Sequence, residues 1–80
     1  MNEDTLVYIL SRIINNAKDS IEALCLYPED DFYKGKRLAY YEVLDTVKNE
    51  LDVREYNLKK YGLELDLEKM LFELYGDENR

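Results

Sequence analysis

The segment Tyr27-Pro28-Glu29-Asp30-Asp31 separates two long helical patterns and thereby sets the architecture of the chain. Pro28 has no backbone N–H and disfavours a helical residue before it, yet it is well tolerated in the first turn of a new helix. The three carboxylates that follow are typical of a helix start, where they lie near the positive end of the helix dipole. One helix therefore ends before Pro28 and a second begins at about residue 31. Because the connection is short, the two helices are expected to pack as an antiparallel hairpin.

The first helix is expected to run from about residue 4 to about residue 26. Asn2 or Asp4 can cap its start, and the acidic residues there complement the helix dipole. Its apolar residues recur at the helical steps of three and four and spread over an arc of roughly 160°, wide enough to contact more than one neighbour. The stripe consists of Leu6, Val7, Ile9, Leu10, Ile13, Ile14, Ala17, Ile21, Leu24 and Cys25. Free cysteines are among the most buried residues, so Cys25 is expected in the core.

The second helix is expected to run from about residue 31 to about residue 61. Lys59 and Lys60 suit the negative end of its dipole, and Gly62 can take the left-handed conformation that ends a helix. The inner stripe is Tyr40, Leu44, Val47, Leu51, Leu58 and Tyr61, flanked by Phe32, Ala39 and Val43. Gly35 lies inside this range and costs about 1 kcal/mol relative to Ala, but we expect the helix to continue through it.

The C-terminal part of the sequence predicts a connector and a short helix. Leu63-Glu64-Leu65-Asp66-Leu67 alternates like a strand, but no second strand pattern exists to pair with it. Asp66 is expected to cap a helix over about residues 67–75, which Gly76 ends, and residues 77–80 are expected to form a frayed tail. The predicted fold class is therefore all-α: a long antiparallel helical hairpin plus a short C-terminal helix, in a single domain over residues 1–80.

This predicted hairpin does not bury all of its apolar surface. At 1.5 Å per residue its helices measure roughly 33 Å and roughly 45 Å, and a short third helix covers only part of their apolar arcs. Two copies packed into a four-helix-like bundle would bury the remainder. We therefore expect a homodimer.

The composition removes several kinds of function. The chain has 80 residues, no His and one Cys, which excludes His-based acid–base catalysis and leaves too few soft ligands for most zinc sites. The carboxylates at residues 29–31 lack the ligand spacing and the glycine of a calcium loop. No catalytic, cofactor-binding or metal-binding residue and no small-molecule substrate is therefore predicted. The lone Cys, the acidic N-terminus and the lack of an 18-residue apolar stretch lead us to expect a cytoplasmic protein that is not in a membrane.

Four residues of the predicted second helix are candidates for partner binding: Leu38, Tyr41, Arg54 and Tyr56. Arg54 falls in the apolar stripe, where it either covers apolar surface and reaches Glu50 or fixes the register of an interface. The other three lie on the reverse side, where the third helix or a second subunit covers them or a protein partner binds. The leading hypothesis is a non-enzymatic protein–protein interaction or adaptor module that forms a homodimer and engages another protein.

A nucleic-acid-associated regulator is the alternative hypothesis. Residues 33–41 hold the one cluster of basic and aromatic side chains, with Lys34, Lys36 and Arg37 available for phosphates and tyrosines available for stacking on bases. Nearby carboxylates and the net charge of −7 oppose this hypothesis, because phosphate electrostatics supplies much of such affinity.

A phosphatase-like regulator is the third hypothesis, and it depends on a short resemblance. Lys48-Asn49-Glu50-Leu51-Asp52 resembles, over its last three residues, the Ser-Gln-Glu-Leu-Asp motif of small helical-hairpin phosphatases that act on aspartyl-phosphate response regulators. That family carries the motif on its second helix, as the predicted position does here. The Ser and Gln are replaced by Lys48 and Asn49, which puts the activity in doubt.

Overall fold

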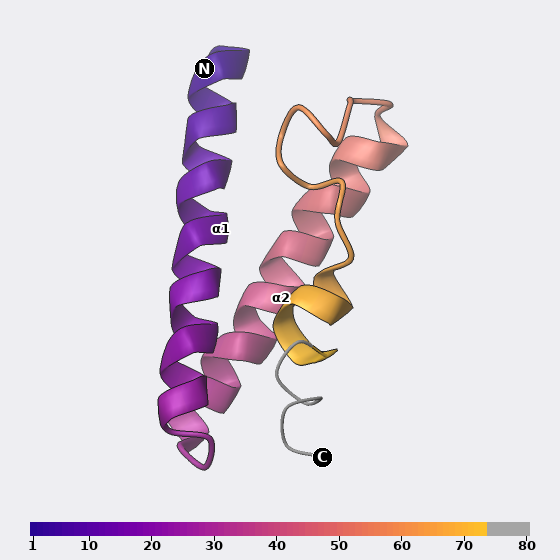
Figure 1. Ribbon diagram of the computed structural model, residues 1–80. Helices are drawn as coiled ribbons and strands as arrows, with labels where there is room; N and C mark the ends of the chain where they lie inside the picture. The colour runs from indigo at the N-terminus through magenta and orange to yellow at the C-terminus, as the bar shows by residue number, and fades with distance from the viewer. Residues whose placement is uncertain (74–80) are drawn as a thin grey trace.

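The computed structural model describes residues 1–73, and these residues form two long helices and one short helix. α1 (Glu3–Leu26) and α2 (Asp31–Val53) run antiparallel, and the π-helix η1 (Lys69–Glu73) packs against both of them. Residues 54–68 return from the end of α2 along the hairpin to η1 (Figure 1). The all-α hairpin with a short third helix is thus confirmed. The predicted helix end at residues 74–76 and the predicted tail at 77–80 lie outside the described residues.

The connection between α1 and α2 follows from local capping chemistry. The Thr5 amide donates to Asn2 Oδ1 (2.8 Å) at the start of α1, so Asn2 rather than Asp4 is the cap. The Phe32 amide donates to Asp30 Oδ1 (2.9 Å) at the start of α2. These bonds satisfy backbone donors that a helix start leaves without internal partners. α2 continues through Gly35, as predicted.

The end of α2 differs from the prediction, which placed it at about residue 61. The Tyr56 amide donates to the Leu51 carbonyl (2.9 Å) and the Glu55 amide donates to the Asp52 carbonyl (3.0 Å), so the helix ends at Val53 in a Schellman motif. Glu55 occupies the left-handed position of that motif, with a φ of 65°, where glycine is usual.

Helix length explains this earlier end. α1 has 24 residues and α2 has 23, so both helices measure about 35 Å. They diverge from the connecting turn, and the returning segment lies between their far ends, where Lys60 and Tyr61 contact Glu3 (Figure 1). A helix that continued to residue 61 would extend about 10 Å beyond the start of α1, where no neighbouring helix could cover its apolar stripe. Gly62 does have a left-handed φ of 75°, but it closes a separate turn that begins at Leu58.

The core lies between the hairpin and the returning segment of residues 54–73. Leu44 of α2 is fully buried, and so are Leu63 and Leu71 of the returning segment. The Lys48 amine donates to the Leu65 carbonyl (2.6 Å) and ties the segment to α2. The Lys69 amide donates to Asp66 Oδ1 (3.2 Å), which confirms the predicted cap of the third helix. The buried hydrophobic residues are Leu10, Ile14, Ala17, Leu24, Leu44, Leu51, Tyr61, Leu63, Leu67 and Leu71.

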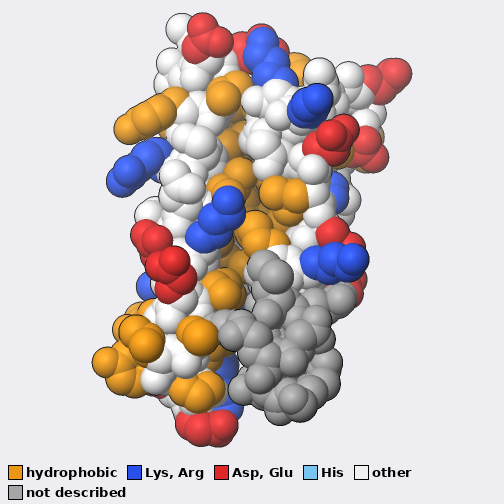
Figure 2. Space-filling model, viewed as in Figure 1, with side chains coloured by type: hydrophobic (Ala, Val, Ile, Leu, Met, Phe, Trp, Pro, Cys, Tyr) orange, Lys and Arg blue, Asp and Glu red, His pale blue; other side chains and the backbone are white. Residues whose placement is uncertain are grey.

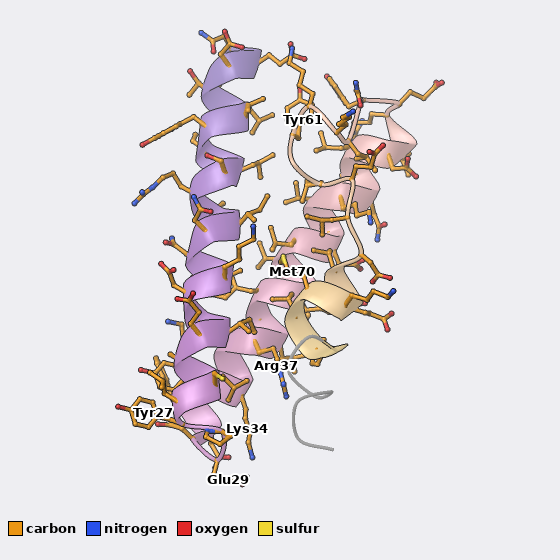
Figure 3. The ribbon with its side chains drawn as sticks, in the orientation of Figure 1. Tyr27, Glu29, Lys34, Arg37, Tyr61 and Met70 are labelled. Atoms are coloured by element: carbon orange, nitrogen blue, oxygen red, sulfur yellow. The ribbon has the colours of Figure 1, made fainter. Side chains whose placement is uncertain are left out.

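A polar contact holds the returning segment to the first turn of α1. The Glu3 carboxylate accepts hydrogen bonds from the Lys60 amine and from the Tyr61 hydroxyl (2.9 Å), near the upper end of the molecule in Figure 3. The Lys60 contact lowers the pKa of Glu3, and the Tyr61 hydrogen bond acts in the same direction. Burial raises the pKa of Tyr61, and its bond to the carboxylate raises it further. The prediction that Lys60 complements the negative end of the second helix is wrong, because α2 ends at Val53 and Lys60 pairs with Glu3.

The molecule is elongated and flat for its size. Its Cα radius of gyration is 13.5 Å, against about 11.6 Å for a compact chain of 80 residues. Its extents are 40 × 21 × 15 Å. Its accessible surface is 5749 Å², about 650 Å² more than the about 5,100 Å² typical of a compact monomer of 9.6 kDa. The chain therefore keeps more surface in contact with water than a monomer of its mass usually does.

Candidate functional site

The four predicted partner-binding residues do not form one surface. Leu38 is exposed on α2, whereas Tyr41 is partly buried and packs edge-on against Phe72 of η1, with ring centroids 5.5 Å apart. The third helix therefore covers Tyr41. Burial raises the pKa of the Tyr41 hydroxyl, and the negative charges of Asp45, Glu68 and Asp66 raise it further. This phenol stays protonated and serves the packing of η1 on α2.

Arg54 and Tyr56 lie at and beyond the end of α2. Arg54 caps the helix and pairs with Glu50 (3.2 Å), which confirms the predicted contact with that carboxylate. Tyr56 is exposed on one side and packs edge-on against Tyr61, with centroids 5.9 Å apart. Since α2 ends at Val53, Tyr56 is not on the same helix face as Leu38. The predicted grouping depended on a helix that continued past residue 56.

The three basic residues of the alternative hypothesis each contact a different neighbour. Lys34 pairs with Glu29 (3.5 Å) at the end of the hairpin. Lys36 lies over the Phe32 ring, 5.3 Å from its centroid, and Arg37 lies over the ring of Phe72 in η1, at 4.7 Å. Figure 3 shows Lys34 at the tip of the hairpin and Arg37 beside η1. Each of these cations is thus engaged by a separate group of the same chain.

The residues of the phosphatase-like segment have structural roles in this fold. Leu51 is buried in the core, and Glu50 pairs with Arg54. Lys48, at the position of the family's Ser, ties the returning segment to α2. Asn49 donates to Asp45 Oδ2 (3.3 Å). Among residues 1–73, no three His, Cys, Asp or Glu side chains are grouped so that they could hold a metal ion.

One face of the hairpin carries two shallow hollows that are lined by α1 and α2 alone. The first, of about 270 Å³, lies on α2, and the second, of about 290 Å³, lies between α1 and α2. Residues 54–73 line neither hollow, although they do line the two grooves on the other side of the hairpin. We call this side the open face. Its hollows are lined by Asn16, Asp19, Ser20, Ala23, Tyr33, Lys36, Ala39, Tyr40 and Val43.

The α2 side of the open face has an unbroken spacing of four and three residues. Its members are Lys36, Tyr40, Val43, Val47 and Glu50. This is the spacing of the contact positions of helical bundles and coiled coils. Val43 is 49% exposed at the centre of this stripe, whereas the next residue, Leu44, is fully buried on the covered side. Tyr40 and Val47 are partly buried and pack against the edge of the core, so Val43 is the exposed apolar residue of this stripe.

The α1 side of the open face continues the apolar surface. Ile9 is 38% exposed and Ile13 is partly buried, and the two are one helical turn apart. Val43 was predicted to flank the inner stripe and Ile9 to widen the arc of the first helix. The sequence-based prediction did not separate Val43 and Ile9 from the inner stripes as part of a second face. The four–three spacing from Lys36 to Glu50 was the available signal.

An exposed aromatic cluster adjoins the open face at the end of the hairpin. Tyr27 stacks on Tyr33 with centroids 6.2 Å apart, and Phe32 packs edge-on against Tyr33 at 5.3 Å. Figure 2 shows hydrophobic side chains gathered at this end of the molecule. Cys25 is also exposed here, so its predicted burial is wrong. Successive helical residues are about 100° apart, and the burial of Leu24 turns Cys25 away from the core.

Comparison of the chain with protein-family models, with curated proteins and with solved structures found no match. Within residues 1–73, no helix combines the length and the apolar character needed to cross a membrane.

Proposed function

We propose that the chain is a non-enzymatic helical protein-interaction module whose docking surface is the open face of the hairpin. The exposure of Val43 at the centre of the α2 stripe, beside the partly buried Tyr40 and Val47, carries this proposal. Apolar helix faces of this spacing recognise other helices or helical grooves. Aromatic and small residues beside the stripe give a partner both anchors and room for close approach.

The surface expected from the sequence is replaced by this one. Leu38 and Tyr56 remain exposed but lie apart, and Tyr41 is covered by η1. The open face instead brings α1 and α2 together in one continuous surface. Since Cys25 is an exposed thiol, which persists in a reducing compartment, we propose that the module works in the cytoplasm.

Site-specific photo-crosslinking tests the docking surface. A photo-crosslinking residue, p-benzoylphenylalanine, replaces Val43 in one variant and Glu42 in a matched control, and each is irradiated in living cells. Val43 lies on the open face, and Glu42 is its exposed neighbour about 100° around the helix. We expect discrete covalent adducts from position 43 and none from position 42. Equal adducts from both positions, or none from position 43, would contradict the proposal.

We do not propose a second function. Lys34, Lys36 and Arg37 have separate intramolecular contacts, so no observation favours a nucleic-acid surface. The same holds for the phosphatase-like segment, whose Glu50 is paired and whose Leu51 is in the core.

A further inference from the structure

The open face has a symmetry that identifies one kind of partner. Lys36 comes seven residues before Val43 and Glu50 comes seven residues after it on the same stripe of α2. At 1.5 Å per residue, each charge lies about 10 Å from Val43 along the helix axis. A stripe with a cation and an anion at equal distances from an apolar centre is complementary to itself when one copy is reversed.

We propose that the partner of the open face is a second copy of the chain, with the two α2 helices antiparallel about a twofold axis at Val43. This inference rests on the proposed function, because it names the partner of the same surface. In this register Lys36 of each copy faces Glu50 of the other, which forms two equivalent ion pairs. Ala39 of each copy faces Val47 of the other, so a small residue accommodates a larger one beside the hollow of about 270 Å³.

The same register provides partners for two exposed groups at the end of α2. Arg54 of one copy faces Phe32 and Tyr33 of the other, and guanidinium groups bind favourably over aromatic rings. These rings already hold one cation, since the Lys36 amine lies 5.3 Å and 5.9 Å from their centroids. Glu50 then lies between Arg54 of its own copy and Lys36 of the other. Val53, which is 76% exposed, comes opposite the same aromatic cluster.

The surface area is consistent with a second copy. Over its whole surface the chain exposes about 650 Å² more than a compact monomer of its mass, which is of the same order as the about 800 Å² that a stable interface buries on each partner. Each copy carries −7, and two copies repel one another in general, but the stripe from Lys36 to Glu50 has one cation and one anion.

Charge reversal tests the register. Molar mass is measured by light scattering across a dilution series, with a reducing agent present so that exposed Cys25 cannot link copies. We expect wild type to form a dimer near twice 9.6 kDa. Lys36→Glu and Glu50→Lys each place like charges together twice per dimer, so each should raise the dimer Kd by about ten-fold or more. The double variant restores both pairs and should return the Kd to within about three-fold of wild type.

Matched controls separate this effect from net charge. Lys18→Glu and Glu42→Lys make the same charge changes at exposed positions away from the open face and should leave the Kd unchanged. Circular dichroism establishes that every variant is folded. A monomeric wild type at the highest concentration would refute self-association. A dimer that the single reversals leave intact, or that the double reversal fails to restore, would refute the register.

Disulfide trapping gives a second readout that does not depend on charge. In a Cys25→Ser background, Val43→Cys places a thiol on the twofold axis, next to the equivalent thiol of the other copy. Glu42→Cys does not bring two thiols together in this way. Mild oxidation should therefore link the Val43→Cys protein into covalent dimers much faster than the Glu42→Cys protein. Equal rates would refute the axis. Photo-adducts with a different protein at position 43, from a chain that is monomeric in solution, would leave the proposed function standing and remove only the second copy as partner.

Discussion

Replacing each of two glycines by alanine should change stability in opposite directions. Gly35 lies inside α2, and a Cβ built there meets nothing within 4 Å. Alanine is favoured over glycine in a helix interior by about 1 kcal/mol, so Gly35→Ala should stabilise the fold by about that amount. No packing change opposes this gain.

Gly62 is in the left-handed region, with a φ of 75°. A Cβ there meets Ile14 Cδ1 at 3.5 Å, which is ordinary contact, so the effect of Gly62→Ala comes from the backbone alone. The left-handed conformation costs an L-residue about 1–2 kcal/mol, and the reduced freedom of the unfolded chain returns about 0.4–1 kcal/mol. The net destabilisation should be about 1 kcal/mol.

Thermal and urea denaturation followed by circular dichroism measure both effects. A change of 1 kcal/mol shifts the Tm of a chain of this size by about 4–8 °C, so the two variants should lie on either side of wild type. All samples need equal protein concentrations, because self-association would add its own stabilisation. The double variant should be close to wild type, since the two sites are independent. Shifts of the same sign would refute the reasoning, because α2 would then not run through Gly35 or Gly62 would not be left-handed.

Four further perturbations test other parts of the structure. Glu55→Gly should stabilise the chain by about 0.5–1 kcal/mol in urea denaturation, because glycine accepts the left-handed position at the end of α2 more readily. Leu63→Ala should destabilise it by about 2–5 kcal/mol in the same assay, since Leu63 is fully buried in the returning segment. Because the pKa of Glu3 is lowered in the fold, its contacts stabilise the fold above the ordinary carboxyl pKa and are lost as pH falls through the folded pKa. Between pH 7 and pH 3, the Tm of Glu3→Gln should therefore decrease less than the Tm of wild type. Cys25 should react with a thiol reagent in the native protein at a rate close to that of the urea-unfolded chain, which a spectrophotometric thiol assay measures.

The hairpin could be predicted from the sequence because its signals are local. Pro28 and the carboxylates after it specify a break and a new start within a few residues, and capping by Asp30 depends only on neighbouring amides. The stripe of α1 is regular over its whole length and fixes the helix to within a residue of its observed start. Asp66 likewise caps the third helix, because it accepts a hydrogen bond from the amide of Lys69, only three residues later.

The end of α2 could not be predicted because tertiary packing decides it. The apolar period continues through Leu58 and Tyr61, and glycine follows at position 62, so every local signal favours a longer helix. The length of α1 limits how much of α2 can be covered, and the chain reverses at Glu55 although no glycine is there. Local preference and packing conflict at this position, and packing prevails.

The candidate site depended on the same missing information. Both helices carry apolar arcs that are too broad for one neighbour to cover. The sequence does not indicate which side of the hairpin the returning segment packs against. Once residues 54–73 cover one flank, Val43 on the other flank is left exposed, with Tyr40 and Val47 partly buried beside it. The grouping of Leu38 with Tyr56 failed for the converse reason, since it assumed a helix that the reversal at Glu55 interrupts.

In the proposed dimer, the returning segment would also limit the size of the assembly. A bare helical hairpin has two adhesive sides, and units with two such sides add to one another without end, as in a filament. Here residues 54–73 occupy one side, with Leu63 and Leu71 filling it from within the same chain. In the proposed dimer each copy would use its one remaining adhesive side, and growth through that side would stop after a single addition. The segment that completes the core would then also prevent the addition of further copies.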